Sequence, residues 1–344
     1  MSASTDGPTS TLSSAGARAL SAVRSLATWR DYQFKDKVVL ITGGSRGLGL
    51  VLARMLAREG ARLAILARDP DELERAHEEL AALTPEVLAL TCDVTDRVDV
   101  ETAIRLAEGK LGRIDVLINN AGVIQVGPME TMTLDDYEEA MNTHFWAPLY
   151  ATLAVLPEMR ARREGRIVNI SSIGGKVSVP HLLPYSASKF ALTGLSAGLR
   201  AELLKDNIMV TTVCPGLMRT GSPRNATFKG QHRAEYAWFA ISDSLPFTST
   251  SAESAAARII KACKRGEAEV VLTPQAKLVA RVAGVFPGFV ANVMGIVNAV
   301  LPAPGGVGAH RVRGEDSESP LAPSLLTVLG DKAAVRNNEV ASSG

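Results

Sequence analysis

The chain has few cysteines, few aromatic residues and no excess of charge of either sign. Its three cysteines, Cys92, Cys214 and Cys263, are odd in number and form no Cys-X-X-Cys pair, which argues against a disulfide framework and favours a reducing, cytoplasmic compartment. The five histidines show no metal-ligand spacing, so we expect no metal site. With 37 basic and 36 acidic residues and no long basic run, nothing indicates a nucleic-acid surface.

The composition is that of a globular protein, with 46% hydrophobic and 21% charged residues. The first thirty residues are rich in Ser, Thr and Ala and lack the apolar core of a secretory signal. A transit peptide has a similar composition, but a flexible tail with a short helix over 17–29 is the preferred interpretation. We expect three regions: an extension over 1–36, one α/β domain over 37–275, and an apolar helical segment with a tail over 276–344.

From Lys37 onward, short apolar runs alternate with helical patterns. The runs are KVVLIT, ARLAILA, EVLALTCDV, IDVLINNAG, GRIVNISS, IMVTTVCPG and EAEVVLT. Asp69 before Pro70 predicts a helix start, and Asp136 after Thr133 predicts a capping interaction. Strands separated by helices indicate an open parallel sheet covered on both faces. The predicted fold is therefore a doubly wound, Rossmann-type α/β fold of about seven strands.

A glycine-rich turn, TGGSRGLG, joins the first predicted strand to the first helix. Gly43, Gly47 and Gly49 follow a TGxxxGxG spacing, and such glycines let the backbone approach a pyrophosphate at a helix N-terminus. A glycine-rich turn alone is a weak indicator, because many loops contain one. Its position between a strand and a helix is what predicts a dinucleotide site.

The end of the second strand bears on which dinucleotide binds. An acid there would bind the ribose 2′-hydroxyl of NAD(H), whereas arginines accommodate the 2′-phosphate of NADP(H). The strand ends in Ala67 and Arg68, and Arg46 in the glycine turn can approach the same pocket. Asp69 is a competing acid, but before Pro70 it fits a helix cap better. The pattern favours NADP(H) and leaves NAD(H) open.

The stretch PYSASKF places Tyr185 and Lys189 four residues apart, on one face of a predicted helix. An ammonium beside a phenol lowers the phenol pKa from its usual value of about 10. The pair can therefore act as an acid–base catalyst. The alternative is a half-buried tyrosine packed on a lysine stem, and the pair alone does not decide between them.

Five motifs in register, TGGSRGLG, NNAG, NISS, YSASK and CPG, resemble those of the short-chain dehydrogenase/reductase family over residues 37–273. The resemblance implies that Tyr185 is the general acid or base and that Lys189 lowers its pKa and binds the nicotinamide ribose. It favours Ser172 over Ser171 as the group that binds the substrate oxygen. Further positions that it assigns to the cofactor site are Ser45, Leu48, Asp93, Val94, Asn119, Ala121, Gly122, Pro215, Gly216 and Thr220.

One position departs from the family pattern. Family members usually carry an asparagine in the helix after the fourth strand, where it anchors a water between the lysine and solvent. Here His144 takes that place. It can serve in place of the asparagine through its backbone carbonyl, relay protons through its imidazole, or be a packed core residue. The sequence leaves these alternatives open.

Two segments surround the predicted core. Residues 217–251 include the aromatics Phe228, Tyr236, Trp238 and Phe239, which either line an apolar substrate site or pack a lid onto the body. Residues 282–301 are twenty residues without a charge, interrupted by Pro287. They are long enough to cross a bilayer, but we expect helices over the substrate entrance, or peripheral membrane contact through 276–301. Residues 302–344 are expected to form a linker and a short helix without chemistry.

These features predict an NADP(H)-dependent oxidoreductase that transfers a hydride between nicotinamide and a carbonyl or secondary alcohol of an apolar small molecule. The alternative is a dinucleotide-binding regulatory or scaffold protein with little turnover, which only His144 supports. The family resemblance also implies a homo-oligomer, although the C-terminal extension can block the usual interface.

Overall fold

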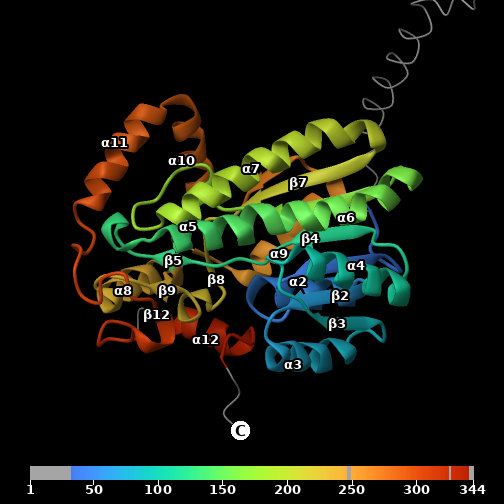
Figure 1. Cartoon of the computed structure of the whole chain (residues 1–344), viewed down its shortest axis with the longest axis horizontal. Coiled ribbons are helices and arrows are strands. Elements are labelled where there is room, and N and C mark those ends of the chain that lie inside the picture. Colours follow the sequence, from blue (N-terminus) through green and yellow to red (C-terminus); the bar gives the residue numbers. More distant parts are fainter. Residues whose placement is uncertain (1–31, 246–248, 325–326, 341–344) are drawn as a thin grey trace, which may run out of the picture.

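The central sheet consists of seven parallel strands in the order β11-β7-β6-β4-β1-β2-β3 (Figure 1). The computed structural model describes residues 32–245, 249–324 and 327–340, and the helix expected over 17–29 lies outside them. All seven strands coincide with the predicted apolar runs, so the predicted doubly wound fold is confirmed. The strands are β1 (Val38–Thr42), β2 (Arg62–Ala67), β3 (Val87–Thr91), β4 (Val116–Asn119), β6 (Gly165–Ile170), β7 (Ile208–Cys214) and β11 (Glu269–Val271).

Helices cover both faces of this sheet. The helices on one face are α2 (Gly47–Arg58), α3 (Pro70–Ala81) and α9 (Ala252–Arg265). Those on the other are α4 (Arg97–Leu111), α6 (Ala147–Arg162) and α7 (Leu183–Leu203). Because both faces are covered, strands such as β1 and β4 are wholly buried, and they are apolar up to their last residues, Thr42 and Asn119. The strand order reverses at β1, which pairs with both β2 and β4, and the ligand crevice of such folds opens at that point.

Local caps fix where two of the helices begin. Asp69 accepts a hydrogen bond from the Glu72 amide at the start of α3. Thr133 and Asp136 form a reciprocal capping box at the start of α5 (Leu134–Met141). Both helix starts agree with the sequence prediction. Between α5 and α6, residues Asn142–Trp146 form a π-helical turn that carries His144, and such turns are frequent at functional sites.

Residues 217–245 and 249–251 form a lid beside the carboxyl edge of the sheet. Its elements are β8 (Leu217–Arg219), η5 (Ser222–Arg224), β9 (Thr227–Phe228), α8 (His232–Ser244) and β10 (Ser249–Ser251). Strand β9 pairs with β5 (Gln125–Val126) of the body. Phe228, Tyr236 and Phe239 are buried against Val126 and Leu182. These three aromatics therefore pack the lid onto the body, which is one of the two predicted alternatives.

The C-terminal extension begins with a helical hairpin, α10 (Pro274–Val285) and α11 (Pro287–Asn298), which projects from one end of the molecule (Figure 1). Within the described part of the chain, no helix is both long enough and apolar enough to cross a membrane. The chain then returns to the body, where β12 (Val312–Arg313) pairs with β9. The expected short helix is α12 (Val328–Arg336), which packs against α8 and β8.

Candidate active site

Ser172, Tyr185 and Lys189 come together at the carboxyl end of β6. Ser172 follows the strand, and the other two lie in the first two turns of α7. The Ser172 side chain is hydrogen-bonded to the Tyr185 phenol, and its Oγ accepts the Gly174 amide at 3.0 Å. Lys189 Nζ lies 5.6 Å from the centre of the Tyr185 ring and donates to the Ile170 carbonyl at 2.9 Å. The three predicted catalytic side chains are therefore neighbours.

The adjacent Ser171 has different partners. Its hydroxyl donates to the Lys189 carbonyl at 3.1 Å and lies 2.8 Å from the Thr193 hydroxyl. It therefore ties the end of β6 to the backbone of α7. Of the two serines, Ser172 is the one hydrogen-bonded to the tyrosine.

Burial dominates the electrostatics of this group. It raises the pKa of the Tyr185 phenol, and the hydrogen bond from Ser172 offsets part of that rise. Burial also lowers the pKa of Lys189 to about 7. The expected lowering of the tyrosine pKa by a charged lysine is not found here, because Lys189 is itself desolvated and partly neutral at neutral pH. A lysine that titrates near neutrality still exchanges protons readily under working conditions.

His144 packs beside Tyr185, with the two ring centroids 5.4 Å apart in an edge-to-face arrangement. Its Nε2 accepts the Val123 amide at 3.1 Å, and its Nδ1 lies 2.8 Å from Ser188 Oγ. Because Nε2 accepts, Nδ1 carries the proton and donates to Ser188. Burial, and then the charge of Lys189, holds the pKa of His144 well below its usual range. A neutral ring with both nitrogens bound to protein groups fits a positioning role better than a proton relay.

The glycine turn has the shape that a pyrophosphate requires. Gly43 and Gly47 have φ angles of +65° and +55°, in the region that favours glycine. A Cβ on Gly49 would lie 2.0 Å from the Gly43 carbonyl oxygen, so only glycine allows the helix to start this close to the turn. Asn120, which the sequence analysis did not single out, donates to the Thr42 and Gly43 carbonyls at 3.1 and 2.9 Å. These residues fit a dinucleotide phosphate.

The remaining predicted cofactor residues lie at the same edge of the sheet. Each follows the carboxyl end of a strand or belongs to the first turn of α2. Arg68 follows β2 and is exposed, while Thr220 follows β8 and is buried. The others are Ser45, Leu48, Asp93, Val94, Ala121, Gly122, Pro215 and Gly216.

The side chain of Asn119 is arranged differently from the expectation. It lies inside the sheet, where Nδ2 donates to Asn169 Oδ1 at 2.8 Å, and Asn169 in turn donates to Ser196 Oγ at 3.0 Å. Asn119 therefore contributes to the cross-strand packing of β4 and β6. Among the two asparagines of the NNAG motif, Asn120 is the one whose amide reaches the glycine turn.

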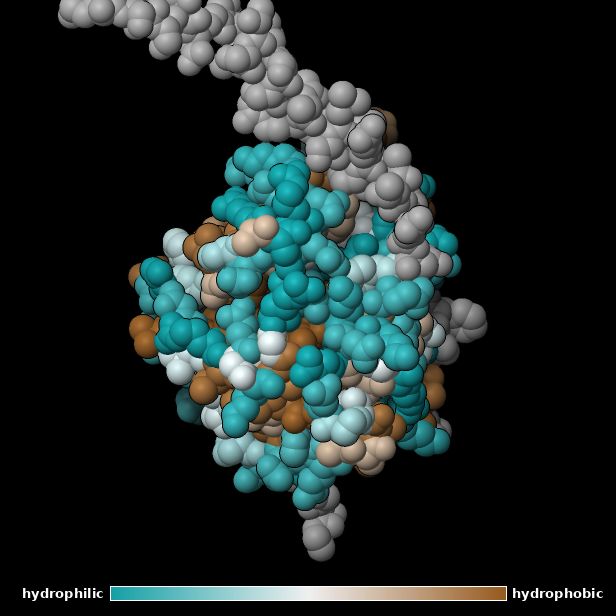
Figure 2. Space-filling view, turned by 90° about the vertical axis from the view of Figure 1, so that its right-hand side faces the viewer, coloured by the Kyte–Doolittle hydropathy of each residue, from teal (hydrophilic) through white to brown (hydrophobic). Residues whose placement is uncertain are grey.

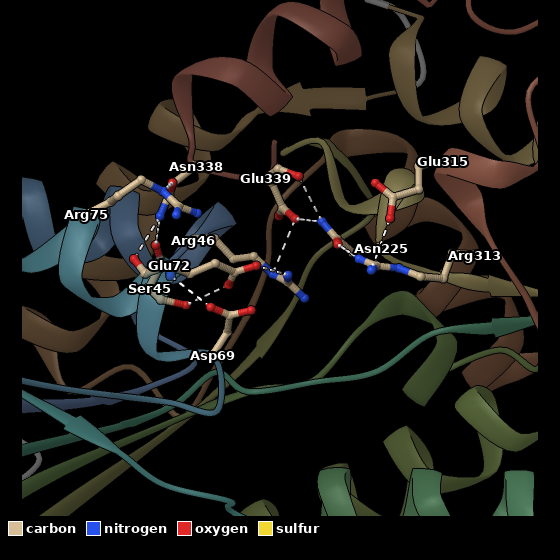
Figure 3. A network of polar contacts seen from close by, with 10 residues as sticks. All are labelled: Ser45, Arg46, Asp69, Glu72, Arg75, Asn225, Arg313, Glu315, Asn338 and Glu339. Atoms are coloured by element: carbon tan, nitrogen blue, oxygen red, sulfur yellow. Dashed lines mark hydrogen bonds and ion pairs between the residues drawn. The ribbon is translucent and has the colours of Figure 1, made fainter. Parts of the chain in front are cut away.

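The C-terminal tail reaches the glycine turn, which no local sequence pattern predicts. Arg46 pairs with Glu72 at 2.6 Å and with Glu339 at 3.4 Å. Asn338 donates to the carbonyl of Ser45 at 2.9 Å. These contacts join the start of α2 to the last described residues of the chain (Figure 3). The sequence predicts a linker and a short helix over 302–344 and does not place this segment at the glycine turn.

Comparisons with known proteins agree with this geometry. The family model described as short chain dehydrogenase matches residues 37–229. A dehydrogenase/reductase SDR family protein 7-like from Anopheles gambiae is 37% identical over 244 residues, which cover 69% of this chain and 75% of the relative. A 3-ketodihydrosphingosine reductase from Bacteroides thetaiotaomicron is 39% identical over 191 residues, covering 56% of this chain and 67% of the relative.

A solved structure shows the same arrangement of elements. The short-chain dehydrogenase from Streptomyces avermitilis has a TM-score of 0.64 and 30% sequence identity, covering 76% of this chain and 96% of that one. The sequence matches, the parallel sheet and the grouping of serine, tyrosine and lysine all point to one family. The chain therefore belongs to the short-chain dehydrogenase/reductase family, whose members are oxidoreductases that use a nicotinamide dinucleotide.

Proposed function

We propose that the protein is an NADP(H)-dependent oxidoreductase that interconverts a carbonyl and a secondary alcohol on an apolar small molecule. The observation that carries this proposal is the contact between Ser172, Tyr185 and Lys189 at the carboxyl edge of the sheet, beside the glycine turn. The dinucleotide, when bound, supplies or accepts the hydride. The residues of the protein bind and orient the cofactor and the substrate, and they transfer a proton.

Each of the three side chains has a distinct part in this proposal. The Tyr185 hydroxyl donates a proton to the substrate oxygen during reduction and takes one back during oxidation. Ser172, which is hydrogen-bonded to that hydroxyl, stabilises the charge that develops on the substrate oxygen. Lys189, with a pKa of about 7, returns the proton to the tyrosine. His144 holds the first turn of α7 in place through Ser188.

The preference for NADP(H) rests on two arginines. Arg68 follows β2 and is exposed to the crevice edge, and Arg46 lies in the glycine turn. Asp69, the competing acid, is engaged in capping α3 through the Glu72 amide at 2.9 Å. Two guanidiniums can bind a 2′-phosphate with charge-assisted hydrogen bonds. Arg68→Ala should therefore weaken NADPH binding several-fold more than NADH binding.

An apolar groove supports the assignment of an apolar substrate. It has a volume of about 1250 Å³ and lies between the helical hairpin and the body. Val177 and Val179, in the loop that joins Ser172 to Tyr185, line one side of it, and Val290 and Met294 of α11 line the other. The groove therefore adjoins the catalytic loop. One relative is named for the reduction of 3-ketodihydrosphingosine, a keto compound, which fits this proposal.

We propose further that the hairpin rests on the surface of a membrane. Val285, Phe286, Phe289, Ile296 and Val300 are between 61% and 81% exposed, and the twenty residues over 282–301 carry no charge. Exposed aromatic and branched side chains gathered at such a hairpin can insert into the interfacial region of a membrane. Figure 2 shows the opposite end of the molecule, where hydrophilic side chains predominate and apolar ones are scattered among them.

Sedimentation with phospholipid vesicles tests this membrane contact. The wild-type protein should sediment with vesicles, and the double variant Phe286→Ser/Phe289→Ser should stay in the supernatant. Val98→Ser removes an apolar side chain that is 68% exposed on α4, away from the hairpin, and should sediment like the wild type. Equal sedimentation of all three proteins would exclude the hairpin as the anchor.

The oxidoreductase itself is tested by following NADPH and NADH oxidation with a panel of long-chain and short-chain ketones. We expect turnover with NADPH that Tyr185→Phe lowers by about 10³-fold, since general acid catalysis contributes about 10²–10⁴-fold. Binding of NADPH should change little in that variant. Tight NADPH binding without turnover on any ketone or alcohol would instead favour the dinucleotide-binding regulatory protein.

A further inference from the structure

The last described residues of the chain fold back onto the start of α2. After α12, the chain turns at Asn337 and Asn338. Asn338 has a φ angle of +57°, a left-handed conformation that asparagine tolerates better than most residues. The turn directs the Glu339 side chain toward the glycine turn, as Figure 3 shows.

Two oxygen groups of this tail lie against Gly47. The Gly47 amide, the first of helix α2, donates to the Asn337 carbonyl at 2.9 Å. The Glu339 carboxylate lies so close that a Cβ on Gly47 would be 2.6 Å from Glu339 Oε1. The Cβ of Thr220 would be 4.0 Å from the same point, and Asn337 Nδ2 donates to the Thr220 carbonyl at 3.4 Å. The tail therefore contacts both the glycine turn and Thr220.

Side chains on three elements hold the tail in this position. Glu339 Oε2 accepts Asn225 Nδ2 at 2.6 Å and lies 3.4 Å from Arg46 Nε. Asn338 Nδ2 donates to the Glu72 carbonyl at 3.0 Å, in addition to Ser45. Glu339 is only 9% exposed. These contacts are specific and largely buried, so the tail is a docked element of the fold.

Helix α12 anchors the tail independently of these contacts. Ala333 and Ala334 are buried, and a Cβ on Gly221 would lie 2.4 Å from the Cα of Ala334. The backbone of α12 at Ala334 thus packs directly against the backbone of the lid at Gly221. Residues 337–340 can therefore swing away at the Asn337–Asn338 turn while α12 stays in place.

The tail presents acceptor oxygens to the glycine turn, as a phosphate group would. The N-terminus of a helix attracts anions, because its amides point outward and the helix dipole is positive there. The Asn337 carbonyl and the Glu339 carboxylate supply acceptor oxygens to that end, and Arg46 pairs with the carboxylate. A dinucleotide pyrophosphate needs the same amide and the same space. The two cannot occupy it together.

We propose that residues 337–340 are an internal competitor of the dinucleotide. They occupy the pyrophosphate part of the cofactor site in the free protein and leave it when the dinucleotide binds. The apparent affinity for the dinucleotide is then the intrinsic affinity multiplied by the fraction of molecules in which the tail is released. The inference rests on the proposed function only in requiring that a dinucleotide binds at this turn.

Calorimetric titration of full-length variants with NADP⁺ and NADPH tests the competition. Glu339→Ala removes the contacts with Arg46 and Asn225, and Asn338→Ala removes those with Ser45 and Glu72. Each should tighten binding by about fivefold, a typical size for coupling between two sites. Glu318→Ala serves as the matched control, because Glu318 lies in the same extension but pairs at the surface with Arg224 at 3.2 Å. Its affinity should stay within about twofold of the wild type.

Hydrogen–deuterium exchange in the wild-type protein gives a second readout that does not depend on turnover. The Glu339 amide donates to the Ala334 carbonyl at 2.9 Å in the docked tail. Amides over 338–340 should exchange faster when NADP⁺ saturates the protein, while those over 328–335 stay protected. If the amides over 338–340 were equally or better protected from exchange in the complex, the proposal would be overturned. The tail would then be a fixed part of the cofactor site that stays in place when the dinucleotide binds.

The outcomes separate this inference from the proposed function. Dinucleotide binding that releases the tail, without turnover on any substrate, would support the inference and reject the oxidoreductase. Turnover, with dinucleotide affinity unchanged in both tail variants, would support the oxidoreductase and reject the inference. If neither the wild type nor the tail variants bind a dinucleotide, the tail is not what limits access, and the inference is wrong.

Discussion

The imidazole Nδ1 of His144 lies 2.8 Å from the Ser188 hydroxyl, and that hydroxyl donates to the Tyr185 carbonyl at 2.9 Å. The π-helical turn before α6 is thereby joined to the first turn of α7. Tyr185 lies in that first turn. His144 therefore helps to hold Tyr185 in place indirectly, through Ser188 and the backbone carbonyl of Tyr185. The histidine at the position of the family asparagine is therefore joined through Ser188 to the helical turn that carries the proposed catalytic tyrosine.

This arrangement predicts how a His144 variant behaves. His144→Asn loses the ring and both of its hydrogen bonds in a buried site, so the free energy of unfolding should fall by about 1–3 kcal/mol. The shape of the pH profile of kcat should not change, because the imidazole is neutral throughout the working range. Urea unfolding and a pH series of initial rates measure both quantities.

Ser188→Ala provides the control for the histidine. It breaks the same chain of hydrogen bonds at the other end and should lower stability by about 1 kcal/mol, again without moving the pH profile. The positioning role would be contradicted if the His144→Asn protein had normal stability and the pH profile of its kcat lost its decline on one side. It would show that the histidine carries a proton.

The two adjacent serines at the end of β6 give a matched pair for catalysis. Ser172→Ala should lower kcat by about 10²–10³-fold, because it removes a group that stabilises charge on the substrate oxygen. Ser171→Ala should leave kcat within about threefold and lower the free energy of unfolding by about 1 kcal/mol, since its hydroxyl only joins β6 to α7. Steady-state kinetics and thermal unfolding of both variants separate the two roles. A larger loss of kcat in Ser171→Ala would reverse the assignment.

Much of the fold could be predicted because its determinants are local. Each strand is a short apolar run, and the helix starts at Asp69 and Thr133 carry their caps within four residues. The proposed catalytic tyrosine and lysine are one helical turn apart. The glycine turn likewise joins a strand to the helix that follows it. Features of this kind depend on residues that are close in the sequence, so they can be predicted from local sequence patterns.

The parts that could not be predicted depend on contacts between distant segments. Gly47 and Asn337 meet across nearly the whole chain, and nothing in the residues around Asn337 indicates that partner. The pKa shifts of Tyr185 and Lys189 could not be predicted either. Burial raises the first pKa and lowers the second, and burial depends on how the whole chain folds around YSASK. The direction of the Asn119 amide depends on Asn169 of the neighbouring strand.

A buried ion pair joins the lid to α5 and predicts a large effect on stability. Lys229 and Asp136 are both buried and paired, and Arg311 of the C-terminal extension lies 2.8 Å from the same carboxylate. Burial alone would raise the pKa of Asp136, but hydrogen bonds from Lys229 and Thr133 outweigh it and lower the pKa. Lys229→Met leaves this carboxylate buried without its main partner, so the free energy of unfolding should fall by about 3–5 kcal/mol.

Two further variants check this interpretation in urea unfolding. Arg311→Ala removes the more exposed partner and should lower stability by only about 1 kcal/mol. Adding Asp136→Asn to Lys229→Met should recover part of the loss, because no buried charge remains. If Lys229→Met and Arg311→Ala lower stability equally, the buried pair is not the dominant contact.

The docked tail also predicts that dinucleotide affinity depends on pH. Burial raises the pKa of Glu339 from its usual 4.5 to about 7, with Arg46 and Asn225 opposing the rise and Glu72 adding to it. The docked tail thus takes up a proton that the released tail does not. Docking is therefore strongest at low pH, weakens as the pH rises toward about 7, and changes little above that.

Glu339→Gln isolates this effect, because glutamine mimics the protonated acid and does not titrate. Wild type and variant should bind NADP⁺ with equal affinity near pH 4, below both pKa values of Glu339, where both tails are docked. By pH 8 the wild type should bind about fivefold more tightly, since its ionised carboxylate favours release. Taking the ratio of the two affinities at each pH cancels the titration of the ligand's own phosphate. A ratio that stays constant, or that moves in the opposite direction, would show that the ionisation of Glu339 does not control the tail.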